Sequence, residues 1–481
     1  MNISQEFFNV PKSLISRHYT DSNVLPEYRS EFMRDRDRLM YATAFRRLAG
    51  KTQIYTVGSD DHRKNRLTHT LEVSQIARTI AAALGLNTDL AEAISLAHDF
   101  GHTPFGHAGE QMLHEIMIPN ATVVKNSPFY RTNLKTLKDT FGRESPEKID
   151  YLDYAFGFKH NLQSVRVTAL LEDSYRGGSD ENIGLNLTNY TLYGMMLHSN
   201  AFYKHGDKYP NFHHFFDEQM KANGAPAPAW SFEAYIVKWA DDIAQWHHDL
   251  EDAIRDGALP LSRICDTIKE SLGEKLSSDD EQVLDDIKKI TKMDRKCLAD
   301  LSHIVVNTLV NDIIETSKSN FNVLIVEIET KNIDNPETFF NEYEKLGFSL
   351  NKENVISFSE KIKSQNFKDV IRASIHHSRN VVRMNEKGCY IIRKLFEAYY
   401  AHPQQLPDGP ILHILVDIEL DNYETIDKAK KAAIGDARIA FENVLKNPNI
   451  YTKCILMRRI CDHIASMTDK YAVEEYNNLY G

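Results

Sequence analysis

Cysteine is scarce in this sequence. Five of the 481 residues are cysteines, and they form no CxxC pair and no spacing typical of a zinc site. An odd number of thiols in a long chain argues against a disulfide framework, so we expect reduced thiols in the core, as in a cytoplasmic protein. The five residues are Cys265, Cys297, Cys389, Cys454 and Cys461.

Long apolar runs and an excess of positive charge are also lacking. No stretch approaches the roughly 18 apolar residues of a membrane span, and residues 1–17 contain no continuous apolar run of the kind found in a secretory leader. With 57 Lys and Arg against 68 Asp and Glu, the net charge is -11. This balance excludes a surface coated in basic charge for non-specific nucleic-acid binding, although it leaves room for a local basic patch. We expect a soluble, cytoplasmic protein.

Helical periodicity dominates what is present. Apolar residues recur at intervals of three and four in several long segments, whereas alternating patterns are rare. The predicted helices span residues 67–84, 89–100, 164–175, 232–254, 295–317, 371–400 and 452–471. The best strand candidate is 321–328, and one isolated strand makes no sheet. The sequence therefore predicts a mainly α fold with few short strands.

Composition suggests a division of the chain into three parts. Polar or Gly/Pro-containing linkers occur around residues 176–179, 223–228 and 403–410. The charge-rich stretch 257–368 contains none of the candidate catalytic, metal-binding or substrate-binding residues. We therefore predict a catalytic core over 1–256, an accessory helical insertion over 257–368, and a C-terminal helical part over 369–481 that packs on the core.

The densest chemistry lies between His98 and Glu110. Three histidines and two carboxylates occur within these thirteen residues, together with three glycines and a proline. His98 and the adjacent Asp99, at a helix end, can face one cation, and His69 and Asp241 on other helices can supply further ligands. Two nitrogens and two oxygens suit Mn, Mg, Co, Fe or Zn. Such a set leaves positions open for water and a phosphoryl oxygen, as a catalytic metal requires.

Six segments in order resemble those of a known family. They are FRRLAGKTQ (45–53), RLTHTLEV (66–73), HDFGHTPFGHAGE (98–110), GLNLT (184–188), ADDIA (240–244) and RRICDHIASMTD (458–469). This set resembles the HD-domain superfamily, and in particular the deoxynucleoside triphosphate triphosphohydrolase (dGTPase) family. The HD pair alone is modestly specific, whereas the ordered set covers most of the chain and is highly specific. The resemblance implies an HD-domain helical fold.

The resemblance also implies roles for the residues of the centre. His107 and Glu110 match positions that activate the attacking water or relay its proton, and His102 matches a position that faces the triphosphate. A histidine can exchange protons at cellular pH, and a carboxylate can orient it. The implied metal ligands are His69, His98, Asp99 and Asp241.

Substrate contacts are implied in the same way. Gln53 matches a position that reads the deoxyribose, because a carboxamide can both donate to and accept from a hydroxyl. Asp249, two helical turns beyond Asp241, matches a further sugar contact. Arg66 lies one turn before His69, and its guanidinium can donate two hydrogen bonds to phosphate oxygens.

The sequence departs from the family pattern at two substrate positions. Gln245 stands where many members have a tyrosine that packs on the sugar, and His198 stands where a Lys-Tyr pair is frequent. Lys204 and Lys208 follow shortly and could supply the missing phosphate cation. The departures concern the identity of the substrate, whether dGTP, any dNTP or another nucleotide, and leave the predicted metal centre unaffected.

The implied activity is hydrolysis of dGTP or other dNTPs to a deoxynucleoside and tripolyphosphate, with a divalent metal as cofactor. One alternative is another HD-type phosphohydrolase acting on nucleoside monophosphates, dinucleotides or alarmones. Another is a nucleotide-sensing or single-stranded-DNA-binding protein of the same fold. All expected ligands and both proton-handling residues are present, which favours catalysis. The resemblance further implies a homo-oligomer and, as candidate partners, a regulatory nucleotide or single-stranded DNA.

Overall fold

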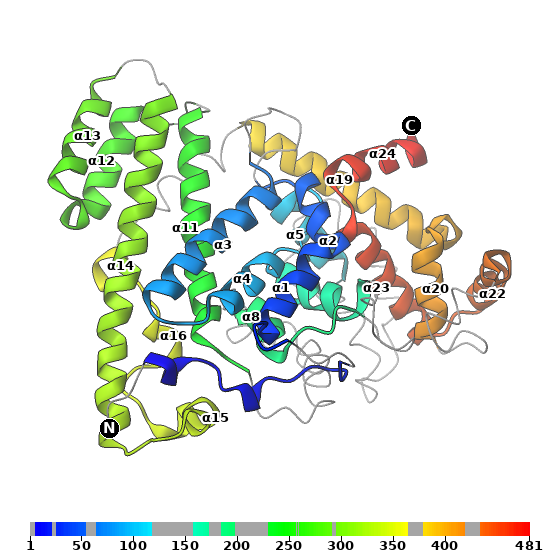
Figure 1. Ribbon diagram of the computed structural model, residues 1–481. Helices are drawn as coiled ribbons and strands as arrows, with labels where there is room; N and C mark the ends of the chain where they lie inside the picture. Colours follow the sequence, from blue (N-terminus) through cyan, green and yellow to red (C-terminus); the bar gives the residue numbers. More distant parts are fainter. Residues whose placement is uncertain are drawn as a thin grey trace.

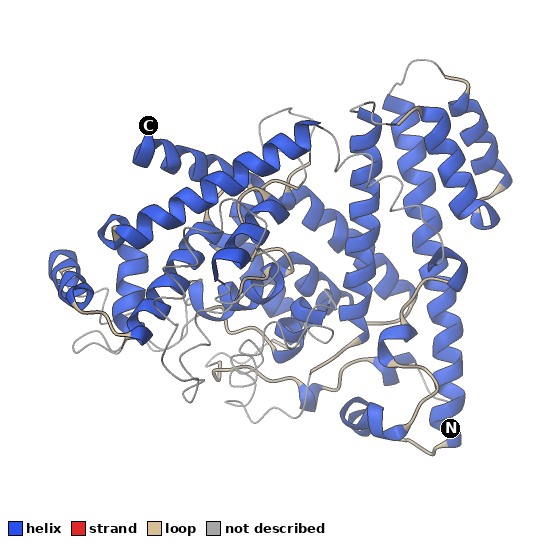
Figure 2. Ribbon diagram, turned by 180° about the vertical axis from the view of Figure 1, so that it is seen from behind, coloured by secondary structure: helices blue, strands red, loops and turns tan. Residues whose placement is uncertain are grey.

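The computed structural model describes residues 5–21, 26–53, 64–117, 157–172, 184–197, 229–255, 257, 259–290, 295–363, 379–418 and 433–481. Helices dominate these ranges (Figures 1 and 2), which confirms the mainly α class. They contain no strand, so the few short strands that we predicted are not found there. Two isolated bridges join Arg17 to Thr188 and Thr52 to Asn65.

The predicted strand 321–328 is wrong. It lies inside the 36-residue helix α14 (Arg295–Thr330). Its buried residues are spaced three and four apart, as on one face of a helix, whereas Val326 is 62% exposed. The β-branched residues favour a strand locally, but packing of one helical face overrides that preference. The buried residues are Phe321, Leu324 and Ile328.

Helix α14 is also, by length and composition, the one helix of the described ranges that could cross a membrane. Its most apolar window has a mean hydropathy of 1.3, and half of that window is buried inside the protein. The helix packs on α11 (Phe232–Arg255) and α13 (Ser278–Lys288). A core helix of a soluble protein meets the same criterion, so the finding is weak evidence for a membrane span.

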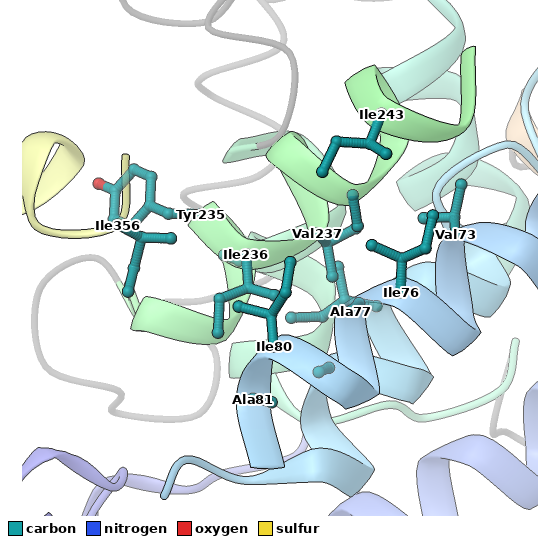
Figure 3. Packing of buried hydrophobic residues seen from close by; sticks show 14 of the residues in the cluster. Val73, Ile76, Ala77, Ile80, Ala81, Tyr235, Ile236, Val237, Ile243 and Ile356 are labelled. Atoms are coloured by element: carbon teal, nitrogen blue, oxygen red, sulfur yellow. The ribbon is translucent and has the colours of Figure 1, made fainter. Parts of the chain in front are cut away.

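Helices α3 (Arg66–Ala83), α4 (Thr88–Ala97) and α11 pack together at the centre of the molecule (Figure 1). Small residues of α3, such as Ala77, let α11 approach closely, and Ile76 and Ile80 pack against Ile236 and Val237 (Figure 3). Each fully buried aliphatic side chain of this kind contributes about 1.5–3 kcal/mol. This packing fixes the three helices that carry the predicted metal ligands.

Shorter helices surround this centre. They are α1 (Glu31–Tyr41), α2 (Thr43–Arg47), α7 (His160–Arg166), which continues as a π-helical turn over Val167–Leu171, and α8 (Asn189–Leu197). Short 3-10 turns span Gln5–Phe8, Lys12–Leu14, Leu48–Gly50, Gly273–Lys275 and Pro403–Gln405. The GLNLT segment anchors the N-terminal region, because Asp35 of α1 accepts hydrogen bonds from Thr188 and Thr191.

The described part of the region 257–368 packs on the outer side of α11. Besides α13 and α14 it contains α12 (Leu261–Leu272), α15 (Pro336–Leu346), α16 (Lys352–Val355) and α17 (Glu360–Lys363). Its buried side chains belong to the same hydrophobic cluster as those of α3, α4 and α11. Trp239 of α11, for example, donates to the Ile356 carbonyl at 2.7 Å. The three-part division of the chain stays a prediction, and this insertion shares its core with the centre.

A second hydrophobic cluster unites the C-terminal helices with α5 (Gly106–Met117). These helices are α19 (Arg379–Ala401), α20 (Asp408–Asp417), α22 (Ile434–Lys446), α23 (Ile450–Ser466) and α24 (Asp469–Tyr480), coloured yellow to red in Figure 1. The predicted single helix 452–471 is two helices, because the chain turns at Met467 and Thr468 caps α24. All five cysteines of the chain are free thiols, as expected.

Candidate active site

The local sequence places each predicted ligand at a defined point of a helix. Asn65 caps α3 in a reciprocal capping box with Thr68, so His69 lies in the first turn. His98 is the C-cap of α4, and Asp99 follows it at the point where the helix has ended. Asp241 lies in the middle of α11. Packing of α3, α4 and α11 therefore brings together side chains that lie up to 172 residues apart.

The four side chains converge on one point. His69 Nε2 lies 2.9 Å from Asp241 Oδ1, and His98 Nε2 lies 3.4 Å from Asp99 Oδ1 and 3.7 Å from Asp241 Oδ1. The ligand atoms of His69, His98 and Asp99 all lie within 4.8 Å of one another. We call these four residues the candidate metal centre.

Hydrogen bonds outside the candidate metal centre orient its ligands. His98 Nδ1 donates to the Ser95 carbonyl at 2.6 Å, which directs Nε2 toward the two carboxylates. Arg66 Nη1 donates to Asp99 Oδ2 at 2.7 Å, so Asp99 Oδ1 is the oxygen that faces the centre. The predicted phosphate contact Arg66 is thus buried and engaged with a predicted ligand.

Burial and charge together set the protonation of this centre. Burial raises the pKa of Asp99, but His98, His102 and Arg66 outweigh it and hold that pKa well below its usual range. Burial lowers the pKa of His98, yet Asp99 and Asp241 raise it to about 9. Both carboxylates therefore stay ionised, and a divalent cation would take the place of the imidazole protons that they now face.

The donor set fits a divalent metal. Two imidazole nitrogens and two carboxylate oxygens converge, and no thiolate is among them. The side chains of His69, His98 and Asp99 are at most 4% exposed, whereas that of Asp241 is 28% exposed. The centre is therefore buried on three sides and open at Asp241, where water and substrate can enter.

A second group of side chains, which we call the proton cluster, adjoins the candidate metal centre. It consists of His102, His107, Glu110 and His160. His160 Nδ1 lies 2.8 Å and His107 Nδ1 3.2 Å from the same Glu110 oxygen, Oε2. The rings of His102 and His160 stack with their centroids 3.7 Å apart. His102 Nε2 lies 3.1 Å from Asp99 Oδ1, so the two groups share a contact.

The proton cluster holds an ionised carboxylate beside two buried imidazoles, His102 and His160. Burial raises the pKa of Glu110, but His160 and His107 hold it well below its usual range. Burial lowers the pKa of His102 well below its usual range, and burial also lowers that of His160. The side chain of His107 is 54% exposed, so it is the imidazole of this cluster that reaches solvent. This arrangement suits a surface-facing imidazole that accepts a proton while a buried carboxylate orients it.

His160 is a site residue that sequence reasoning missed. It lies on α7, 50 residues from Glu110, and Lys159 beside it donates to Glu110 Oε1 at 2.6 Å. Gly101 lets α7 approach the HD turn, because a Cβ there would lie 2.1 Å from the His160 carbonyl. The only available signal was the polar run Lys159-His160-Asn161 just before the predicted helix 164–175.

The predicted sugar contact Gln53 lies in a segment that contacts the start of α3. Lys51 accepts from the Arg66 amide at 3.2 Å through its carbonyl, which ties this segment to the start of α3. Gln53 Oε1 is buried and makes no hydrogen bond to the residues that the structure describes. A Cβ on Gly106 would lie 3.5 Å from the Gln53 carbonyl and 3.4 Å from Arg66 Nη2. Gln53 thus borders both Arg66 and the start of α5.

The remaining predicted substrate contacts divide into two groups. Gln245 and Asp249 follow Asp241 on the same face of α11, at one and two turns. Asp249 is buried and Gln245 is half-buried. The other three, His198, Lys204 and Lys208, lie outside the described residues.

A third group, also not anticipated, lies one turn further along α3 and about two turns further along α11. Glu72 faces His247 and His248, with His248 Nε2 2.7 Å from Glu72 Oε2. These three side chains could hold a metal ion by geometry. The Lys64 ammonium, however, lies 2.9 Å from Glu72 Oε2 and 3.3 Å from His247 Nδ1, among the would-be ligand atoms. We call Lys64, Glu72, His247 and His248 the lysine cluster.

Comparison with known proteins finds two family domains and similar proteins of nearly the same length. Residues 66–145 match the HD domain, and residues 356–411 and 442–478 match the phosphohydrolase-associated domain. The chain is 32% identical over 471 residues to a deoxyguanosinetriphosphate triphosphohydrolase-like protein of Rickettsia rickettsii (strain Iowa), covering 97% of this chain and 95% of that protein. A protein of the same description from Azoarcus sp. (strain BH72) is 30% identical over 474 residues, covering 97% and 94%.

The HD match and the buried His98-Asp99 pair define the class of this protein as an HD-domain phosphohydrolase. The similarity over nearly the whole length narrows the assignment further. The chain belongs to the HD-domain dGTPase family.

Proposed function

We propose that this protein hydrolyses deoxynucleoside triphosphates, dGTP or other dNTPs, to a deoxynucleoside and tripolyphosphate. The observation that carries the proposal is the junction of two chemically distinct groups. The candidate metal centre and the proton cluster meet at the contact between Asp99 and His102. Metal-dependent hydrolysis of a phosphate ester uses a Lewis acid next to a proton acceptor, and at this junction a divalent cation held by the candidate metal centre would lie next to the imidazoles of the proton cluster.

The reaction assigns separate tasks to the two groups. A divalent cation held by His69, His98, Asp99 and Asp241 would supply a Lewis acid for a phosphoryl oxygen. Water attacks the α-phosphorus, the new bond joins water oxygen to phosphorus, and the bond from phosphorus to the sugar O5′ breaks. His107 accepts the proton that water loses, and Glu110 orients the His107 ring through Nδ1. A proton is returned to O5′. Because the bond that breaks joins the α-phosphorus to O5′, the three phosphates leave together as tripolyphosphate.

Substrate recognition follows from the residues that border the candidate metal centre. Gln53 presents a buried carboxamide oxygen that makes no hydrogen bond to the described residues and can accept from a sugar hydroxyl. Asp249, buried on the face of α11 that carries Asp241, can accept a second such hydrogen bond. Gln245 replaces an aromatic contact to the sugar with a polar one, so selectivity for deoxyribose would rest on hydrogen bonds more than on stacking.

Product analysis tests the proposal. The protein is incubated with each dNTP and each ribonucleotide, singly and in mixtures, with Mn or Mg, and the products are separated by anion exchange. We expect tripolyphosphate and deoxynucleoside. Release of orthophosphate or pyrophosphate would instead support an HD phosphohydrolase of another specificity. The mixtures show whether one nucleotide activates hydrolysis of another, which tests the predicted regulatory nucleotide.

A further inference from the structure

The turn between α23 and α24 reaches into the active site from the C-terminal part of the chain. Residues 465–469 form this turn, from the last two residues of α23 to the first residue of α24. On its inner side lie two segments that carry predicted functional residues. One is the segment 51–53, which ends at Gln53, and the other is the turn 102–106, which precedes His107.

Asp469 joins these two segments through one carboxylate. Its Oδ2 accepts a hydrogen bond from the Thr52 hydroxyl, and its Oδ1 accepts from the Phe105 amide at 2.9 Å. Asp469 is 1% exposed and Thr52 is 2% exposed, so water does not compete for either hydrogen bond. Both oxygens of a buried carboxylate are thus used, one on each functional segment.

Lys51 makes a parallel connection. Its buried ammonium donates to the His102 carbonyl and, at 2.9 Å, to the Ala465 carbonyl. The same three segments are therefore joined twice, through Asp469 and through Lys51. The two cross-links come from side chains of opposite charge, Lys51 and Asp469.

The backbone at the junction adopts a conformation that needs such support. Phe105 has φ of 61°, in the left-handed region that residues other than glycine seldom adopt, and Gly106 follows with φ of 59°. The Phe105 ring is pressed against α19, where a Cβ on Gly388 would lie 2.6 Å from the Phe105 Cβ. This turn sets the direction in which α5 starts, and His107 is the second residue of α5.

We propose that Asp469 is a positioning residue for the active site: its carboxylate holds the turn before His107 and the segment of Gln53 in one fixed relation. The C-terminal helices thereby set the distance between the proton-handling imidazole and the sugar-binding amide. The proposal rests on the proposed function for its kinetic readout. Its structural readout, the exchange of backbone amides, does not depend on any activity.

The principal test compares Asp469→Ala with Asp469→Asn. The alanine variant loses both hydrogen bonds. The asparagine variant keeps an oxygen for the Phe105 amide and can donate to the Thr52 hydroxyl through its amino group. We expect the kcat/KM of Asp469→Ala for dNTPs to fall about 100-fold, the usual scale for a misplaced catalytic group, and Asp469→Asn to recover most of it. Bound metal should be unchanged in both variants.

Amide hydrogen exchange, followed by mass spectrometry, supplies the second readout. In Asp469→Ala we expect faster exchange confined to peptides covering residues 51–53 and 101–110. Thr52→Val is the milder variant in case the alanine variant does not fold. It removes the hydroxyl that Asp469 binds, and we expect a higher KM with kcat largely kept, because only the Gln53 segment is released.

Asp417→Asn is the matched control. Asp417 accepts two hydrogen bonds from Arg459, at 2.6 and 2.7 Å, in the same group of helices but outside the active-site turn. The Asp417→Asn variant should have a lower Tm but unchanged kcat, KM and amide hydrogen exchange over residues 101–110. The proposal is overturned if Asp469→Ala keeps wild-type exchange there, if Asp469→Asn is as impaired as Asp469→Ala, or if Asp417→Asn shows the same kinetic loss at equal loss of Tm. Absence of dNTP hydrolysis in the wild type would overturn the proposed function alone, since the exchange readout still decides the role of Asp469.

Discussion

Two groups of histidine and carboxylate residues follow one another along α3 and α11, the candidate metal centre and the lysine cluster, and the first also takes His98 and Asp99 from the end of α4. Each group contains two imidazoles and a carboxylate from α3 or α11, and each has a basic side chain nearby. The position of that basic group differs. Arg66 binds the outer oxygen of Asp99, whereas the Lys64 ammonium contacts ligand atoms of both Glu72 and His247.

The comparison shows that residue types alone do not decide whether a group of histidines and carboxylates can bind a metal ion. The position of the neighbouring basic side chain decides it. In the candidate metal centre, Arg66 neutralises part of the Asp99 charge from the side away from the centre. The ligand atoms of the centre therefore still face one another. In the lysine cluster, Lys64 already occupies the position of a cation. A divalent ion would have to displace an ammonium there, at the cost of the ion pair with Glu72.

Replacing Asp99 by alanine should have the largest effect. The variant loses an oxygen ligand and leaves the Arg66 guanidinium buried without its partner. We expect loss of the bound divalent metal and a fall in turnover of at least about 1000-fold, because a catalytic metal supplies several kcal/mol of transition-state stabilisation. Elemental analysis after gel filtration and a dNTP hydrolysis assay measure the two quantities. Wild-type metal content in this variant would show that the cation lies elsewhere.

Glu110→Gln should separate metal binding from proton transfer. The amide keeps the shape of the side chain but no longer attracts protons from His107 and His160. We expect full metal content and about 100-fold lower kcat, the scale of general acid–base catalysis. If the variant lost its metal as well, the proton cluster and the candidate metal centre would be one site and not two.

Glu72→Gln addresses the lysine cluster. The amide cannot neutralise Lys64, and one of its atoms presents a donor where His247 or His248 now donates. We expect metal content and kcat within about threefold of wild type, and a free energy of unfolding lower by about 1–3 kcal/mol, as for a charged hydrogen bond left partly unsatisfied. Chemical denaturation checks the second value. Loss of the metal would show that Glu72 belongs to the metal centre and that the lysine cluster is not a separate group.

Lys64→Met should have the smallest effect on turnover and gives the sharpest test of the comparison. It removes the ammonium but leaves Glu72, His247 and His248 in place. We expect one additional divalent ion per chain, bound more weakly than the first, at nearly unchanged kcat. Lys64→Arg is the control and should bind no additional ion. An unchanged metal content in Lys64→Met would mean that the imidazoles, and not the lysine, prevent binding there.

Much of the fold was predictable because short-range sequence patterns specify most of its helices. Helices α3, α4 and α11 follow from apolar spacing and from caps such as Asn65 and Asn87, and the HD turn follows from His98-Asp99 and its glycines. The segment 321–328 was not predictable in this way. Its β-branched residues favour a strand, and only the burial of one face in α14 shows that packing decided otherwise.

The sequence by itself determined the helical class, the resemblance to a family, and the candidate ligands, since each of these depends on residue type and short-range spacing. Tertiary structure decided the rest. It brought His160 to Glu110 across 50 residues, placed Lys64 inside the lysine cluster, and set Asp469 against Thr52 and Phe105. The physical reason is that hydrogen bonds and ion pairs between distant segments depend on how whole helices pack, and no local pattern encodes that packing.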